Sequence, residues 1–200
     1  MHRQLKITLI IFLLALGGLV ARKFATRAPQ LTLQSVNNGI TNTGSIAGAQ
    51  ATQSPQIKLR SVGGETFSLA EHKGRAIVFL FSATWSPLAD KTLPAFRRLA
   101  DRYADRAVSF YWVSIDSAKA GEKNYASDAD LQAFVGRAGL HLTVLRDPDR
   151  EAFRALGVDA IPTMVIIDRE GQVYRRHVGF DPEQFDSYSE VVRSLDQLLK

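Results

Sequence analysis

Cysteine is absent from the whole sequence of 200 residues. Without a thiol, the chain cannot form a disulfide, bind a metal through thiolates or catalyse thiol–disulfide exchange by itself. This absence does not identify a cellular compartment, because reduced and oxidised compartments both contain proteins without cysteine. It does restrict the chemistry that a proposed function can use.

Acidic residues are absent from the first 56 positions, which contain five basic residues, Arg3, Lys6, Arg22, Lys23 and Arg27. The chain has 25 basic and 20 acidic residues in total, so the part from Ile57 onward is formally neutral. A neutral domain lacks the basic surface that nucleic-acid binding requires. We therefore expect no nucleic-acid partner, although the whole chain is basic.

No uncharged apolar segment reaches the length of about 20 residues that spans a bilayer without help. The longest one, residues 7–21, would extend about 22 Å as a helix. Its flanking residues Lys6 and Arg22 can extend this reach by placing their charges in the headgroup region. We expect residues 1–24 to be an uncleaved signal anchor that contacts the membrane through 7–21, with a cleaved signal peptide as the alternative.

Charged residues are also missing from 28–57, which is rich in Gln, Asn, Thr, Ser, Gly and Ala. Such a composition cannot bury enough apolar surface to fold alone. The sequence therefore predicts a disordered polar linker at 25–56. One folded domain is expected at 57–200.

The folded part alternates apolar runs of strand length with helical periodicity. Ala76–Ser82 is a buried strand by composition, and a helix is expected from Ser86, as its cap, to about Ala104. A second helix is expected from Asp128, also as its cap. The other elements are expected at 57–62, 66–69, 108–115, 142–145, 148–156, 164–168, 172–178 and 182–199. This order predicts the α/β class.

The turn after the first central strand reads Trp85-Ser86-Pro87-Leu88-Ala89, and a later loop reads Ile161-Pro162-Thr163. These segments resemble the thioredoxin-like superfamily, and most closely the membrane-anchored TlpA and ResA type. That type has Trp-Cys-x-x-Cys at the turn and a cis-proline in the loop. The resemblance implies a thioredoxin-like fold, in which helices flank a central mixed β-sheet. Ser86 and Ala89 stand at the positions of the attacking and resolving cysteines.

The resemblance also implies a binding groove, because the residue before the cis-proline offers its backbone to an extended peptide in this superfamily. The groove residues expected here are Trp85, Ser86, Pro87, Ile161, Pro162 and Gly179. Two further positions depart from the pattern: Leu80 stands where thioredoxins place a buried carboxylate, and Ser82 stands where tryptophan is common. These departures favour a degenerate member of the family over a working dithiol enzyme.

Other chemistry has weaker support in the sequence. Ser86 as a nucleophile would need an adjacent base, and no spacing connects it to His72, His141 or His177. The same histidines with Met164 do not have the spacing of metal ligands, so neither a metal nor a cofactor is expected.

The sequence therefore predicts a redox-inactive protein of the bacterial inner membrane, with a single span and its domain in the periplasm or another extracytoplasmic space. Its partner would be a protein or peptide, in a chaperone, assembly or accessory role. The alternatives are a thiol–disulfide oxidoreductase, as the family implies, and a structural spacer.

Overall fold

The computed structural model describes residues 55–182 and 187–200. The expected signal anchor at 1–24 and residues 25–54 of the expected linker lie outside the described residues. Within the described residues, no helix combines the length and the apolar character that crossing a membrane requires.

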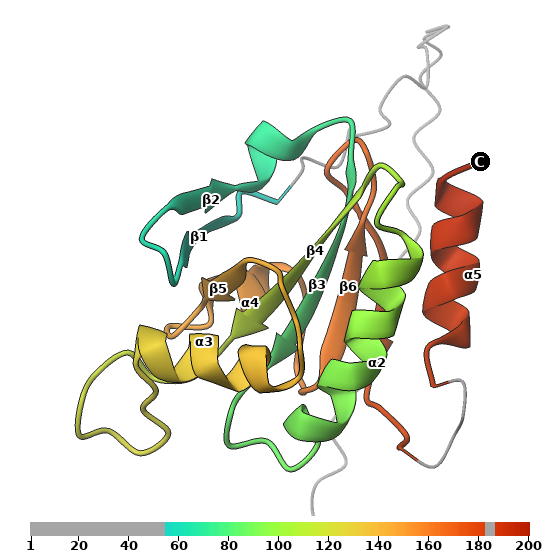
Figure 1. The fold of residues 1–200 in the computed structure, drawn as a ribbon. Helices are drawn as coiled ribbons and strands as arrows, with labels where there is room; N and C mark the ends of the chain where they lie inside the picture. Colours follow the sequence, from blue (N-terminus) through green and yellow to red (C-terminus); the bar gives the residue numbers. More distant parts are fainter. Residues whose placement is uncertain (1–54, 183–186) are drawn as a thin grey trace, which may run out of the picture. The chain divides into compact units, whose positions relative to one another are not determined.

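A seven-stranded mixed sheet forms the centre of the domain, in the order β2-β1-β5-β4-β3-β6-β7 (Figure 1). The strands are β1 (Lys58–Ser61), β2 (Thr66–Ser68), β3 (Ala76–Ser82), β4 (Val108–Ser114), β5 (Val144–Arg146), β6 (Thr163–Ile167) and β7 (Val173–Val178). β3 pairs in parallel with β4 and antiparallel with β6, and β4 pairs in parallel with β5. The carboxyl ends of β3, β4 and β5 therefore meet the amino end of β6 at one edge of the sheet.

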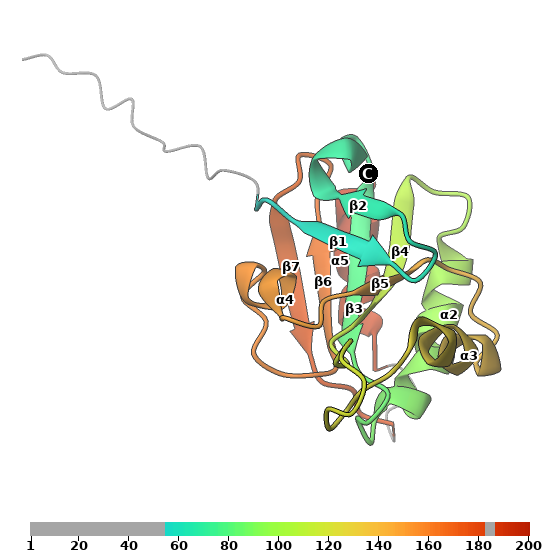
Figure 2. The same ribbon diagram turned by 90° about the vertical axis from the view of Figure 1, so that its left-hand side faces the viewer.

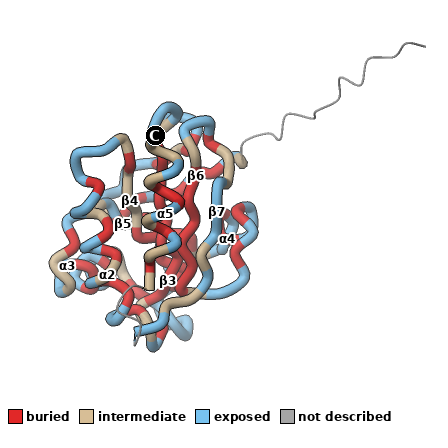
Figure 3. Tube along the Cα trace, turned by 90° about the vertical axis from the view of Figure 1, so that its right-hand side faces the viewer, coloured by how far each residue is buried: buried red, intermediate tan, exposed pale blue. Residues whose placement is uncertain are grey.

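β3 is buried along its entire length, as its continuous apolar sequence predicts for a strand covered on both faces (Figure 3). Ala76, Val78 and Leu80 point into one hydrophobic core, and Ile77, Phe79 and Phe81 point into the other. The alternation follows from the two-residue period of a strand. The end of β3 is consequently packed on both faces, so the turn that follows starts from a rigid part of the sheet.

Helices cover both faces of the sheet (Figure 2). The first core receives side chains from α2 (Ala89–Arg102), α3 (Asp128–Arg137) and α5 (Ser189–Leu198). The second core receives α4 (Glu151–Ala155), the β1–β2 hairpin and the short 3-10 helix η1 (Leu69–His72). The thioredoxin-like α/β arrangement and the expected order of elements are confirmed.

Two expected helix caps are wrong. α2 begins at Ala89, and Leu88 at its N-cap makes no side-chain hydrogen bond to the helix. Ser86 lies three residues earlier, in the turn, because residues 83–89 form consecutive turns before the helix starts. α3 is capped by Ser127 instead of Asp128, through a capping box that Ser127 forms with Asp130. Asp128 is therefore free to bind arginines from other elements.

Candidate functional site

The turn between β3 and α2 holds the residues that correspond to the dithiol motif. The amide of Ser86 donates to the carbonyl of Ala83 at 3.1 Å, and the amide of Ala89 donates to the carbonyl of Ser86 at 3.0 Å. Ser86 is 9% exposed and Ala89 is 1% exposed, whereas Trp85 is 42% exposed. The turn thus presents an aromatic ring to solvent and has no nucleophilic thiol beneath it.

A buried carboxylate supports this turn from the neighbouring strand. Asp116, just beyond the end of β4, is fully buried. It accepts the amide of Thr84 at 3.0 Å, the hydroxyl of Thr84 at 2.6 Å and the hydroxyl of Ser114 at 2.7 Å. Hydrogen bonds to an ionised acceptor are the stronger kind, so Asp116 holds the backbone directly before Trp85 in place.

Asp116 was not singled out from the sequence. The signal that could have identified it is a polar pair, Ser114 and Asp116, at the end of a buried strand. Leu80, at the expected carboxylate position, is fully buried in the apolar core. The carboxylate under this turn therefore comes from the end of β4 and not from β3.

The proline loop lies on the other side of β3. The peptide bond Ile161–Pro162 is cis, as the resemblance predicts. Thr163 pairs with Phe81, so Pro162 lies beside the end of β3. Gly179, at a φ of 86°, donates its amide to the carbonyl of Pro162 at 2.8 Å. In the described part of the chain, neither the amide nor the carbonyl of Ile161 has a hydrogen-bond partner.

A loop after β4, residues 117–126, borders the turn on the side away from the proline. Arg146 fastens both ends of this loop, because its Nη2 donates to the carbonyls of Ser117 at 3.0 Å and Ala126 at 2.8 Å. The side chain of Arg146 is only 4% exposed, and its Nη1 pairs with Asp128 at 2.7 Å.

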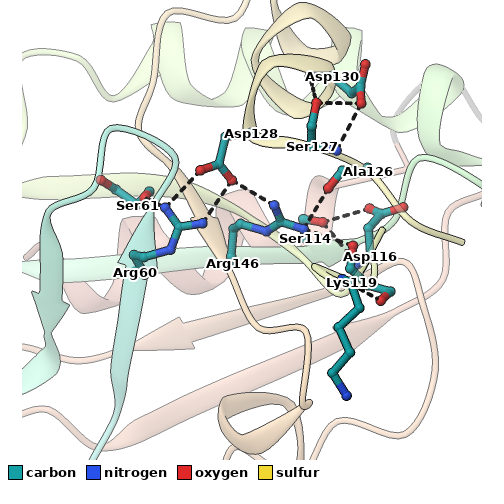
Figure 4. Close-up of polar contacts among 11 residues, drawn as sticks. Arg60, Ser61, Ser114, Asp116, Lys119, Ala126, Ser127, Asp128, Asp130 and Arg146 are labelled. Carbon is teal, nitrogen blue, oxygen red and sulfur yellow. Dashed lines mark hydrogen bonds and ion pairs between the residues drawn. The ribbon is translucent and has the colours of Figure 1, made fainter. Parts of the chain in front are cut away.

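The carboxylate of Asp128 also accepts a hydrogen bond from each terminal nitrogen of Arg60, both at 2.9 Å (Figure 4). The hydrogen bonds from Arg60, together with those from Arg146, lower the pKa of the Asp128 carboxyl to about 2. The ion-pair network therefore links β1, β5 and α3 to the loop.

A small cavity of about 260 Å³ opens between Trp85, this loop and the segment after β5. Its lining includes Ile115, Ala118 and Pro148 as apolar contacts, and Lys119, Glu122, Lys123, Asp149 and Arg150 as charged ones. Neither Ile161, Pro162 nor Gly179 lines it. The cavity therefore lies on the β4 side of the turn, and the proline loop lies on the β6 side of β3.

Two of the three candidate histidines have their contacts away from the turn. His72 contacts Ser68 and Tyr111 within an aromatic cluster, and His177 lies next to Tyr188. Within residues 55–182 and 187–200, no three His, Cys, Asp or Glu side chains form a group that could hold a metal ion.

The model of the AhpC/TSA family matches residues 51–176. The chain belongs to the AhpC/TSA family. The family match spans β1 to β6 and most of β7, including the turn at Trp85 and the proline loop. At positions 86 and 89, this member of the AhpC/TSA family lacks both cysteines of the ResA-type motif.

Named relatives agree with this assignment. The thiol–disulfide oxidoreductase ResA of Halalkalibacterium halodurans is 24% identical over 131 residues, which cover 65% of this chain and 69% of the relative. The thioredoxin-like protein YneN of Bacillus subtilis is 30% identical over 120 residues, covering 60% and 65%. An exposed lipoprotein thioredoxin of Streptococcus pneumoniae superposes with a TM-score of 0.55 at 29% identity, covering 72% of this chain and 99% of that structure.

Proposed function

We propose that this AhpC/TSA-family protein is redox-inactive and binds an extended segment of a partner polypeptide at the Trp85 turn. The unpaired backbone of Ile161, next to the cis-proline and beside the turn, is the observation that carries the proposal. Ile161 is half-buried, and an extended peptide can pair with its free amide and carbonyl as a neighbouring strand would.

The exposed ring of Trp85 supports the same proposal. A large aromatic side chain that is 42% exposed offers apolar area at little cost in conformational entropy, and such residues frequently anchor interfaces. The firm support from Asp116 keeps the backbone before Trp85 in one conformation, which lowers the entropic cost of binding. Ser86 and Ala89 cannot form the mixed disulfide that relatives use, so binding would be non-covalent.

Site-specific photo-crosslinking in cells tests this proposal. A photoreactive residue at Ile161 should capture a partner, and the matched position Lys73, at the opposite end of β3, should not. Adding Trp85→Ala should weaken capture at Ile161, because loss of an anchoring aromatic typically reduces affinity by about thirtyfold or about 2 kcal/mol. Equal capture at both positions, or capture at Ile161 that Trp85→Ala leaves unchanged, would contradict the proposal.

An insulin-reduction assay addresses the redox part separately. The protein should show no reduction above the buffer control, since a serine hydroxyl cannot replace a thiolate in disulfide exchange. Measurable turnover by the purified chain would support the oxidoreductase alternative.

We also propose that residues 7–21 anchor the chain in the bacterial inner membrane, with the domain on the extracytoplasmic side. The uncharged run between Lys6 and Arg22 supports this. Alkaline carbonate extraction should leave the protein in the membrane fraction. Release of a soluble form lacking about 25 residues would indicate a cleaved signal peptide instead.

A further inference from the structure

The cavity beside Trp85 carries an unbalanced set of charges. Three cations and two carboxylates line it. One of those carboxylates is already occupied, because Glu122 pairs with Lys119 at 3.7 Å and accepts the hydroxyl of Ser117 at 2.7 Å. In the described residues, neither Lys123 nor Arg150 has a carboxylate within ion-pair distance. The cavity therefore presents two uncommitted cations, opposed only by Asp149.

Two residues that line this cavity have a left-handed backbone conformation. Asn124 and Arg150 are the two non-glycine residues with positive φ in the described chain, at 69° and 55°, and both line this cavity. Most residues other than glycine and asparagine avoid the left-handed region, so a long residue such as Arg150 stays there only where surrounding contacts impose it. Here the buried Arg146 fastens the carbonyls of Ser117 and Ala126, which fixes the loop on both sides of Asn124.

We propose that this cavity takes an acidic side chain of the polypeptide that binds at the Trp85 turn. The inference rests on the proposed function, because it assigns chemistry to the same bound segment. The carboxylate would meet Lys123 and Arg150, and its methylene groups would lie against Ile115, Ala118 and Pro148. A polypeptide segment paired with Ile161 and passing over Trp85 reaches the cavity next, because β4 and β6 flank β3 on opposite sides.

The size of the cavity agrees with one side chain. Its volume of about 260 Å³ is smaller than the roughly 300–1,000 Å³ of pockets that hold drug-sized ligands. A single Glu or Asp side chain fits such a space and leaves the peptide backbone outside. The proline loop pairs only with the peptide backbone and would bind peptides of different sequence equally. Charge complementarity at the cavity would favour those with an acidic side chain at the matching position.

Peptide display on the full-length protein in detergent tests the inference with a random ten-residue library as the probe. The library is selected against the wild type, and the Trp85→Ala variant serves as the background. Enriched peptides should contain Asp or Glu at one recurrent position. The strongest peptide and its Glu→Gln or Asp→Asn counterpart are then titrated by the fluorescence of Trp85, because Trp112 is fully buried and contributes a constant signal.

Three variants decide where the acidic residue binds. Arg150→Glu should lower the affinity for the acidic peptide by about tenfold at low salt, and Asp149→Asn should raise this affinity by about twofold. The matched reversal Lys73→Glu, far from the cavity, should change the affinity by less than about twofold. In 1 M salt, the difference between the acidic peptide and its amide counterpart should shrink, because the Debye length falls to about 3 Å.

The outcomes separate the two proposals. Peptides enriched without an acidic preference, or an acidic preference that Arg150→Glu leaves unchanged, would overturn the inference and leave the proposed function standing. Absence of enrichment over Trp85→Ala would instead contradict peptide binding at the turn, and the inference with it. Binding of free N-acetylglutamate with the same affinity as the peptide would indicate a small-molecule carboxylate site and would likewise overturn it.

Discussion

The hydroxyl of Thr84 donates a 2.6 Å hydrogen bond to the carboxylate of Asp116, which lies 32 positions later in the chain and is fully buried. The amide of Thr84 donates to the same carboxylate. This contact joins the end of β4 to the turn after β3, the same turn that presents Trp85. The exposed candidate site is therefore supported by a buried charge on the neighbouring strand.

We predict that Thr84→Val lowers the free energy of unfolding by about 2 kcal/mol, because it removes a hydrogen bond to a buried charged group at nearly constant side-chain volume. Thr84→Ser retains the hydroxyl and should cost less than half as much. Urea denaturation followed by circular dichroism measures both. A loss for Thr84→Ser as large as the loss for Thr84→Val would contradict this prediction, because serine keeps the hydroxyl that donates to Asp116.

The ion pairs of Asp128 predict a dependence of stability on pH. Hydrogen bonds from Arg60, and secondly from Arg146, lower its pKa from 3.8 to about 2. A lowered pKa in the folded state contributes stability above the unfolded value, and this stability is lost as the pH falls from about 4 to about 2. Because the Asp128 side chain is 37% exposed, solvent screening reduces the contribution to about 1 kcal/mol.

Asp128→Asn should therefore destabilise the domain by about 1 kcal/mol at pH 7, and the difference from the wild type should disappear near pH 2. Asp105→Asn is the control, because Asp105 is exposed and has no ion pair in the described residues. Its effect at pH 7 should stay within about 0.5 kcal/mol. A loss for Asp128→Asn that is constant across this pH range would rule out the electrostatic explanation.

Ser127, which caps α3, and Ser86, which lies in the turn before α2, should respond differently to alanine. Ser127→Ala should cost about 1 kcal/mol, because the hydroxyl accepts the amide of Asp130 at 3.2 Å in a capping box. Ser86→Ala should change stability by less than about 0.5 kcal/mol, since α2 begins at Ala89 and Ser86 does not cap it. Thermal unfolding of the two variants side by side tests this ranking, and the reverse order would show that Ser86 has a structural role.

Replacing Ser86 and Ala89 together by cysteine should allow a disulfide to form. The amide of Ala89 donates to the carbonyl of Ser86 at 3.0 Å, a turn geometry that keeps the two Cα atoms within about 7 Å. Disulfides span Cα separations of about 4.4–6.8 Å. Mild oxidation followed by thiol alkylation and mass spectrometry should show loss of both thiols within the monomer, and the double variant should gain weak activity in insulin reduction.

The single variant Ser86→Cys is the matched control for this experiment. After oxidation its thiol should stay free or form a disulfide only with another molecule, because the chain has no other cysteine. If the double variant also retains both free thiols after oxidation, residues 86 and 89 do not correspond to a dithiol site.

The amino-acid sequence by itself determined the features that depend on neighbours along the chain. The continuous apolar run of β3 predicted a strand buried on both faces, and the periodicity of the later segments predicted most helices and the α/β order. The short motifs at Trp85 and Pro162 predicted the turn after β3 and the cis peptide bond before Pro162. Helix starts were less well predicted, because Ser86 and Asp128 are both residue types that can cap a helix. Irregular turns keep Ser86 away from the start of α2, and arginines distant in sequence bind Asp128.

Only the tertiary structure decided the contacts between residues far apart in sequence. Asp116 supports Thr84, Arg146 fastens the loop 117–126, and Arg150 shares a cavity with Trp85. These pairings exist because parallel strands bring their carboxyl ends to one edge of the sheet, and the strand order cannot be deduced from local periodicity. Sequence alone therefore located the turn, whereas the support beneath it and the charged cavity beside it required the three-dimensional arrangement.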